Sequence, residues 1–191
     1  MTINTKRVNF YQTVHKMLRR TLFLFAIELA RVDFTQEEEV AWIKIQFAKI
    51  KTYLAVHAQH EHEFFHPLIK QCLGKAYAML ESSHAQQDQR LAEIEDFAQK
   101  ITQTADPITQ QNLGVTLYLR VNRFIAEYLQ HLDEEESVIM PALWEQYDDA
   151  QLMAALKNLL ASMTREEYIN GIMDFLPALS AREGFNLLAF L

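Results

Sequence analysis

Apolar residues recur at intervals of three and four positions along most of this chain, which is the period of an amphipathic α-helix. Only 4 glycines and 4 prolines interrupt its 191 residues. A β-sandwich needs many tight turns, so this shortage of turn-forming residues excludes one, and a hydrophobic content of 50% excludes a disordered chain. The pattern therefore predicts an all-α fold.

Four long segments carry the helical pattern. The predicted helices run from about residue 5 to 32, from Thr35 to just before Gly74, from Ser82 or Ser83 to about 104, and from there past Pro107 to about Tyr147. Long helices joined by short connections pack side by side with alternating direction. We therefore expect an antiparallel, up-down four-helix bundle over residues 5–147.

The last part of the chain, residues 148–191, has a shorter pattern. It indicates two or three small amphipathic helices, with Thr164 and Glu167 in position to cap one of them. No Gly- or Ser-rich linker separates this tail from the rest. We expect the short helices to brace the bundle and residues 1–191 to form a single domain.

The charge balance excludes several classes of partner. A net charge of −7 without clusters of Lys and Arg argues against a nucleic-acid partner. No uncharged segment approaches the roughly 18 apolar residues that a membrane span requires, and the first residues lack the apolar core of a secretion signal. We therefore expect a cytoplasmic protein without a membrane partner.

Cys72 is the single cysteine, so any metal site would rely on His and carboxylates.

Polar residues interrupt the apolar stripes in a regular way. Each of the four predicted helices turns one histidine inward, and these are His15, His57, His84 and His131. Two glutamates, Glu61 and Glu135, each follow a histidine by four residues, a spacing that places both side chains on one helix face. Burying such groups is costly unless they are paired or bind a metal. One common explanation is therefore needed for all six.

The two His-Glu pairs belong to a longer repeat. The pattern His-x3-Glu-x5-Pro occurs at His57, Glu61 and Pro67 and again 74 residues later. Phe64 and Phe65 in the first copy stand where Val138 and Ile139 stand in the second, and we expect these apolar neighbours to shield the site from water. Phe64 and Val138 are expected to continue the inward stripe. The conjunction of the two copies is more specific than either pair alone.

Six inward ligands from four helices suit a pair of iron or manganese ions, with imidazoles at each ion and the two carboxylates bridging them. Two alternatives stay open. Zinc or manganese could occupy the same cage, or the bundle could be a metal-free structural or partner-binding protein whose polar core sets the helix register. A ferritin-like oxidase is disfavoured because its paired Glu-x2-His motif is absent.

These motifs resemble those of the hemerythrin-like family of HHE cation-binding proteins. Members supply a His, then His-x3-Glu, then one or two His, then a second His-x3-Glu or His-x4-Asp along four helices. In this chain the order is met by His15, His57 with Glu61, His84, and His131 with Glu135. The oxygen carriers place a second His in the third helix where this chain has Asp88, so the likeness is closer to di-iron proteins that repair iron centres.

The resemblance implies a function in small-molecule chemistry. It favours a protein with two iron ions that binds, senses or reacts with dioxygen, peroxide or nitric oxide, and it allows an oxidoreductase or iron-centre repair activity. Whether Asp88 or His60 joins the site stays open at this stage. We expect His62 and His66 to be solvated and Glu136 to lie on the solvent side. Tyr11, Tyr53 and Tyr128 each lie one turn before a proposed ligand, and we expect them to serve core packing, the alternative being that a phenol donates to bound oxygen.

Overall fold

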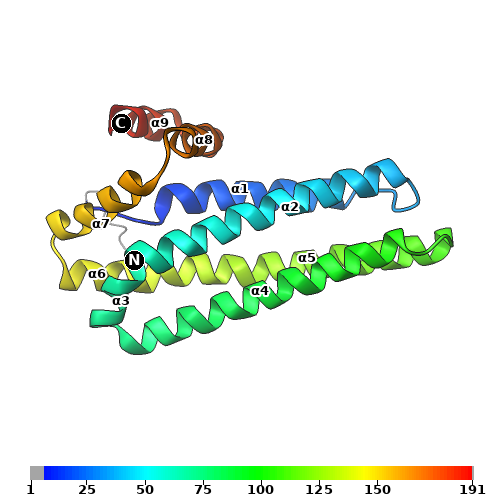
Figure 1. Ribbon diagram of the computed structural model, residues 1–191, viewed down its shortest axis with the longest axis horizontal. Coiled ribbons are helices and arrows are strands. Elements are labelled where there is room, and N and C mark those ends of the chain that lie inside the picture. Colours follow the sequence, from blue (N-terminus) through cyan, green and yellow to red (C-terminus); the bar gives the residue numbers. More distant parts are fainter. Residues whose placement is uncertain (1–6, 191) are drawn as a thin grey trace. The chain divides into compact units, whose positions relative to one another are not determined.

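The computed structural model describes residues 7–190, and every regular element within them is helical (Figure 1). The elements are α1 (Gln12–Leu29), α2 (Glu37–His60), η1 (Glu61–Phe65), α3 (His66–Cys72), α4 (Gly74–Thr102), α5 (Pro107–Glu134), η2 (Glu135–Ile139), α6 (Met140–Gln146), α7 (Asp149–Ser162), α8 (Arg165–Phe175), η3 (Leu176–Ala178) and α9 (Ala181–Phe190). The all-α prediction is confirmed. In the part of the chain that the structure describes, no helix is long and apolar enough to cross a membrane.

Two helix starts differ from those predicted. The predicted first start, at residue 5, lies outside the described residues, and α1 begins at Gln12 because the Asn9 side chain accepts hydrogen bonds from the two backbone amides at residues 11 and 12. The third long helix, α4, begins at Gly74 rather than at Ser82 or Ser83. Leu73, with φ −132° and ψ 48°, ends α3, so the chain bends there and a new helix follows directly.

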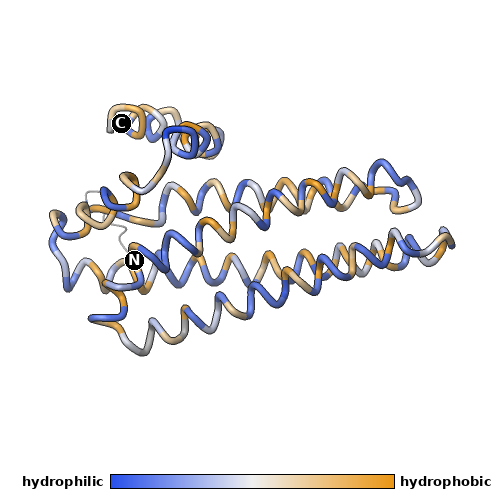
Figure 2. The backbone as a smooth tube through the Cα atoms, viewed as in Figure 1, coloured by the Kyte–Doolittle hydropathy of each residue, from blue (hydrophilic) through white to orange (hydrophobic). Residues whose placement is uncertain are grey.

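The chain divides into two compact units. Among the described residues, the first comprises 7–20, 59–77 and 132–190, and the second comprises Thr21–Ala58 and Ala78–His131. The long helices contribute to both units, and hydrophobic residues recur along each of them (Figure 2).

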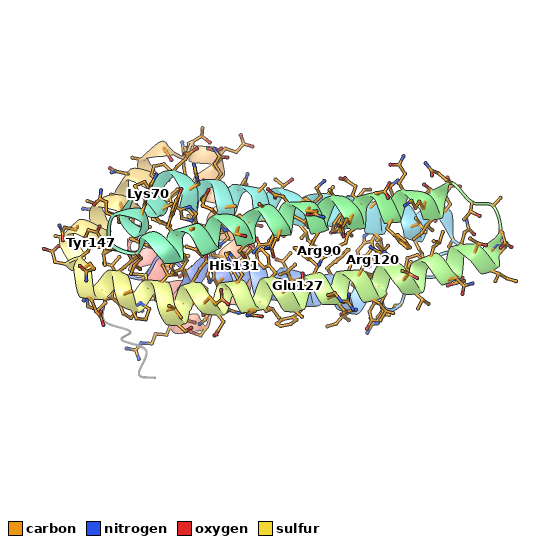
Figure 3. The ribbon with its side chains drawn as sticks, turned by 90° about the horizontal axis from the view of Figure 1, so that it is seen from below. Lys70, Arg90, Arg120, Glu127, His131 and Tyr147 are labelled. Carbon is orange, nitrogen blue, oxygen red and sulfur yellow. The ribbon has the colours of Figure 1, made fainter. Side chains whose placement is uncertain are left out.

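The second unit packs segments of α1, α2, α4 and α5 in pairs. The rings of Phe25 and Phe47 stack with centroids 6.0 Å apart and join α1 to α2. Arg90 of α4 and Glu127 of α5 form an ion pair at 3.4 Å, and both are labelled in Figure 3. Gly114 lies so close to the ring of Phe34 that an added Cβ would fall 2.0 Å from it. This approach explains why the only glycine inside α5 is tolerated there.

The first unit ties the tail to the start of α1. The guanidinium of Arg7 donates to the carbonyl oxygens of Trp144 and Tyr147 at 3.0 and 2.8 Å and pairs with Asp149. Farther along, Lys16 of α1 pairs with Glu183 of α9. The predicted Thr164 cap of α8 is present as a full capping box with Glu167.

Two π-helical turns interrupt the long helices at matching places in the repeat. In η1 the amide of His66 donates to the carbonyl oxygen of Glu61, five residues back, and in η2 Met140 donates to Glu135 in the same way. A proline follows each turn by two residues. Because a proline ring collides with the carbonyl four residues earlier in an α-helix, a wider turn just before it relieves the collision.

Each π-turn holds one extra residue, and this shifts the buried face by one position. Phe65 and Ile139 are buried, whereas Phe64 is half-buried and Val138 is 55% exposed. The prediction that Val138 continues the inward stripe is therefore wrong. The same shift buries His66, which we expected to be solvated, while His62 is exposed as predicted. One added residue turns the following side chains by about 100° around the helix axis.

Candidate metal centre

Two glutamates lie at the first positions of the two π-turns, and both are fully buried in the first unit. Glu61 and Glu135 have no exposed surface. Each of them, together with His15, offers a ligand atom within 4.8 Å of those of the other two. Burial raises the pKa of Glu135 well above its ordinary value, and the negative charge of Glu61 and a hydrogen bond between the two carboxyl groups raise it further. Two such carboxylates are stabilised together only by a proton or a cation.

This set of donors fits a metal ion. Buried carboxylates and imidazoles are the ligands that iron, manganese and zinc accept in proteins, and the carboxylates supply the negative charge that compensates a divalent or trivalent cation. The fit rests on the chemistry of the side chains and on their complete burial.

His15 is oriented by a second pair of charged side chains. Its Nδ1 lies 2.9 Å from Oε1 of Glu136, and its Nε2 lies 3.4 Å from Oε2 of Glu135. Arg19, one turn along α1, donates to both oxygens of Glu136 at 2.6 and 3.2 Å. An ionised Glu136 can only accept, so Nδ1 of His15 donates. In the neutral ring, Nε2 then presents its lone pair toward Glu135, as a metal ligand must.

The prediction that Glu136 lies on the solvent side is wrong. Its side chain is 30% exposed and sits between His15 and Arg19. Burial raises its pKa, but the hydrogen bonds and charges of these two partners outweigh burial and bring it to about 2. Arg19 offered a signal in the sequence, because it follows His15 by four residues, whereas nothing in the sequence separates Glu136 from the acidic run around it.

The second unit brings together two of the remaining histidines. Nε2 of His84 on α4 lies 3.2 Å from Nε2 of His131 on α5, where Figure 3 labels His131. Ser83 Oγ lies 3.3 Å from the other ring nitrogen of His131 and so helps to fix its ring. Two Nε2 atoms that face one point are an arrangement suited to a shared cation. His84 is half-buried and His131 is buried.

His57 occupies the same relation to Glu61 that His131 has to Glu135. Each histidine precedes its glutamate by one helical turn, within a helical run that passes from α2 into η1 or from α5 into η2. His57 is 6% exposed. The first unit thus brings together His15, Glu61 and Glu135, and the second brings together His84 and His131. His57 precedes Glu61 by four residues along the chain.

The two undecided residues differ from these six. Asp88 is exposed and belongs to no metal-ligand group among residues 7–190. His60 is half-buried and likewise joins no such group in the described chain. Burial lowers the pKa of His60, while the charges of Glu63 and Glu167 act in the opposite direction. Both residues therefore lie outside the candidate centre.

Tyr11, which the sequence predicted to serve core packing, lies next to the candidate centre. It is 1% exposed, and its ring lies 5.1 Å from the ring of His15. Burial raises the pKa of its phenol well above the ordinary value, and the charges of Glu135 and Glu61 add to the effect. The phenol therefore keeps its proton at neutral pH.

Helical elements that carry paired His-x3-Glu motifs and bury both glutamates define a cation-binding helical protein of the hemerythrin type. Residues 7–143, more than half of the chain, match the family model of the hemerythrin HHE cation-binding domain. The chain belongs to this family, and the resemblance predicted from its motifs is confirmed.

Similarity to curated proteins is more distant. The chain is 23% identical over 158 residues to F-box/LRR-repeat protein 5 of Bos taurus, a match that covers 82% of this chain and 22% of the relative. For the same protein of Mus musculus the identity is 22% over 156 residues, and for that of Salmo salar it is 21% over 175 residues, covering 81% and 91% of this chain. The chain spans less than a quarter of the length of these relatives.

Proposed function

We propose that this protein binds two iron ions in the core of an antiparallel four-helix bundle. The proposed ligands are His15, His57, Glu61, His84, His131 and Glu135. The observation that carries the proposal is the pair of fully buried glutamates whose ligand atoms lie within 4.8 Å of each other and of His15. Two carboxylates this close bridge two cations more readily than they surround one.

The ligand set favours iron over its alternatives through its mixture of donors. Iron, manganese and zinc all accept imidazole and carboxylate, but two carboxylates that bridge a pair of ions between helices are typical of di-iron proteins, and this favours iron. Zinc or manganese in the same ligands is the alternative occupant. Measuring the metal content of the purified protein distinguishes iron, zinc and manganese.

We further propose that the centre binds or reacts with a small molecule such as dioxygen, peroxide or nitric oxide. Iron in such a site supplies the redox chemistry. The chain's own residues would hold and shield it: Glu136 and Arg19 fix the ring of His15, and the buried side chains of Phe65 and Ile139 follow Glu61 and Glu135 by four residues. A dry and enclosed setting of this kind admits small molecules and excludes bulky organic substrates.

Metal analysis of protein purified without added metal tests the first proposal. About two irons per chain, with a visible absorption spectrum, would support it, whereas one zinc per chain and no visible absorption would support the alternative occupant. Glu61→Ala and Glu135→Ala should each lose at least one metal ion per chain. The matched control is His60→Ala, from the same stretch of chain, which should keep the wild-type metal content.

Ligand binding tests the second proposal. Adding azide or nitric oxide to the iron-loaded protein should change its visible spectrum with a saturable dependence on concentration. If the visible absorption spectrum stays unchanged with every small molecule tested, the metal ions have no open coordination position and the proposed role is refuted.

A further inference from the structure

Tyr11 carries a buried hydroxyl group that no residue of the described chain binds. The side chain is 1% exposed, and its Oη has no hydrogen-bond partner among residues 7–190. A buried hydroxyl without a partner destabilises the folded state, so most such groups in proteins are satisfied by a residue, a water molecule or a ligand. An acceptor from outside the chain is therefore the simplest explanation for this one.

The position of Tyr11 is fixed by its own surroundings. Its backbone amide donates to Oδ1 of Asn9 at 2.9 Å, in the turn that starts α1. Its ring meets the edge of Phe65 at 6.4 Å and an interplanar angle of 77°, and it lies tilted against His15 at 5.1 Å. The hydroxyl is thus held in place by rigid neighbours, which is the condition for a donor to bind a ligand without a large ordering cost.

The ring that carries this hydroxyl lies beside His15, one of the proposed ligands. The negative charges of Glu135 and Glu61 act on the hydroxyl, yet it forms a hydrogen bond with neither. The ring of His15 lies 5.1 Å from that of Tyr11, and Nε2 of His15 lies 3.4 Å from Oε2 of Glu135, so His15 links the phenol to the carboxylates within this unit. A third group can therefore lie within reach of the phenol and of the cations that these carboxylates would hold.

We propose that Tyr11 donates a hydrogen bond to the small anion or diatomic molecule that binds at the metal centre. The inference rests on the proposed function, because it needs a ligand at that centre. A phenol has one hydrogen to give, and an anionic acceptor makes this bond about twice as strong as a neutral one. The Tyr11 hydroxyl would therefore raise the affinity of the metal centre for anions such as azide, and it would leave the metal content of the protein unchanged.

Azide titration of the iron-loaded protein tests this role. Tyr11→Phe keeps the ring and removes only the hydroxyl, so it should weaken azide binding about tenfold while the iron content stays at the wild-type value. The control is Tyr147→Phe, because the hydroxyl of Tyr147 donates to the carbonyl oxygen of Leu68. This variant should leave azide affinity unchanged.

Thermal unfolding of the metal-free proteins gives a readout that does not depend on iron. Tyr11→Phe should leave the melting temperature unchanged or raise it, because the hydroxyl that it removes has no partner to lose. Tyr147→Phe should lower the melting temperature by about 2 to 4 °C, because it breaks an existing hydrogen bond.

Three results would overturn the inference. If wild type and Tyr11→Phe bind azide equally, Tyr11 is no donor, although the proposed function stands. If Tyr11→Phe removes a phenolate-to-iron absorption band, the tyrosine is a direct metal ligand instead. If the iron-loaded wild type binds no azide or nitric oxide at all, the proposed function fails and the inference fails with it.

Discussion

Metal-free protein should lose stability as the pH rises above about 5, because Glu135 is buried beside Glu61. Burial and the neighbouring charge raise the pKa of Glu135 in the folded protein above that in the unfolded chain. Between these two pKa values the folded state holds a proton that the unfolded state has released. Raising the pH therefore favours unfolding, and the stability present below the unfolded pKa is lost as the pH climbs.

The size of the effect follows from the number of protons. One proton difference changes the free energy of unfolding by about 1.4 kcal/mol for each pH unit inside this window. For a chain of 191 residues, 1 kcal/mol corresponds to about 2 to 4 °C in melting temperature. The contribution of Glu135 should therefore be about 3 to 6 °C per pH unit.

Thermal unfolding of metal-stripped variants at about pH 5, 6 and 7 measures this contribution. Glu135→Gln removes this titration, so its melting temperature should fall less steeply with pH than that of wild type. Between the unfolded and folded pKa values of Glu135, the two slopes should differ by about 3 to 6 °C per pH unit. Asp133→Asn removes an exposed carboxylate at the end of α5, two residues before Glu135, and should keep the wild-type slope. Equal slopes for wild type and Glu135→Gln would refute the reasoning.

Three further predictions address the register, the packing and the orientation of a ligand. Ile139→Ala should cost about 2 to 4 kcal/mol in chemical unfolding and Val138→Ala less than about 0.5 kcal/mol, and the reverse order would show that the π-turn is misplaced. Gly114→Ala should destabilise the protein by about 1 to 3 kcal/mol, because the new methyl group overlaps the ring of Phe34, and an unchanged denaturation midpoint would contradict this contact. Glu136→Gln should weaken metal binding about 10- to 100-fold in a competition assay with a chelator, since it loosens the histidine that it holds, and an unaltered affinity would argue against that orienting role.

The sequence was sufficient for the helical class, the family and the choice of candidate ligands. Periodicity marked the long helices, and the repeated His-x3-Glu motif selected Glu61 and Glu135, which the structure buries completely. These features depend on local spacing, which a sequence displays directly. The role of the six residues as metal ligands is still a prediction.

The parts that the sequence could not predict depend on backbone detail and on contacts between distant segments. A regular helical period placed Val138 inward, and only the π-turn that contains it reverses that assignment. Glu136 reaches His15 across 121 positions of sequence, a contact with no local signal. The break near Gly74 was predicted, but the sequence did not show that α4 starts at Gly74 itself, directly after the bend at Leu73, rather than at Ser82 or Ser83.

The paired π-turns have a consequence for how relatives of this protein should be aligned. Each turn inserts one residue just after a proposed ligand, so the sequence that follows is out of phase with any uninterrupted helix. An alignment without a one-residue gap at these points would match inward positions with outward ones. Both halves of the repeat contain the extra residue, so they align with each other without a gap. A relative that lacks the extra residue in one half would have one residue fewer between the glutamate and the proline of that half.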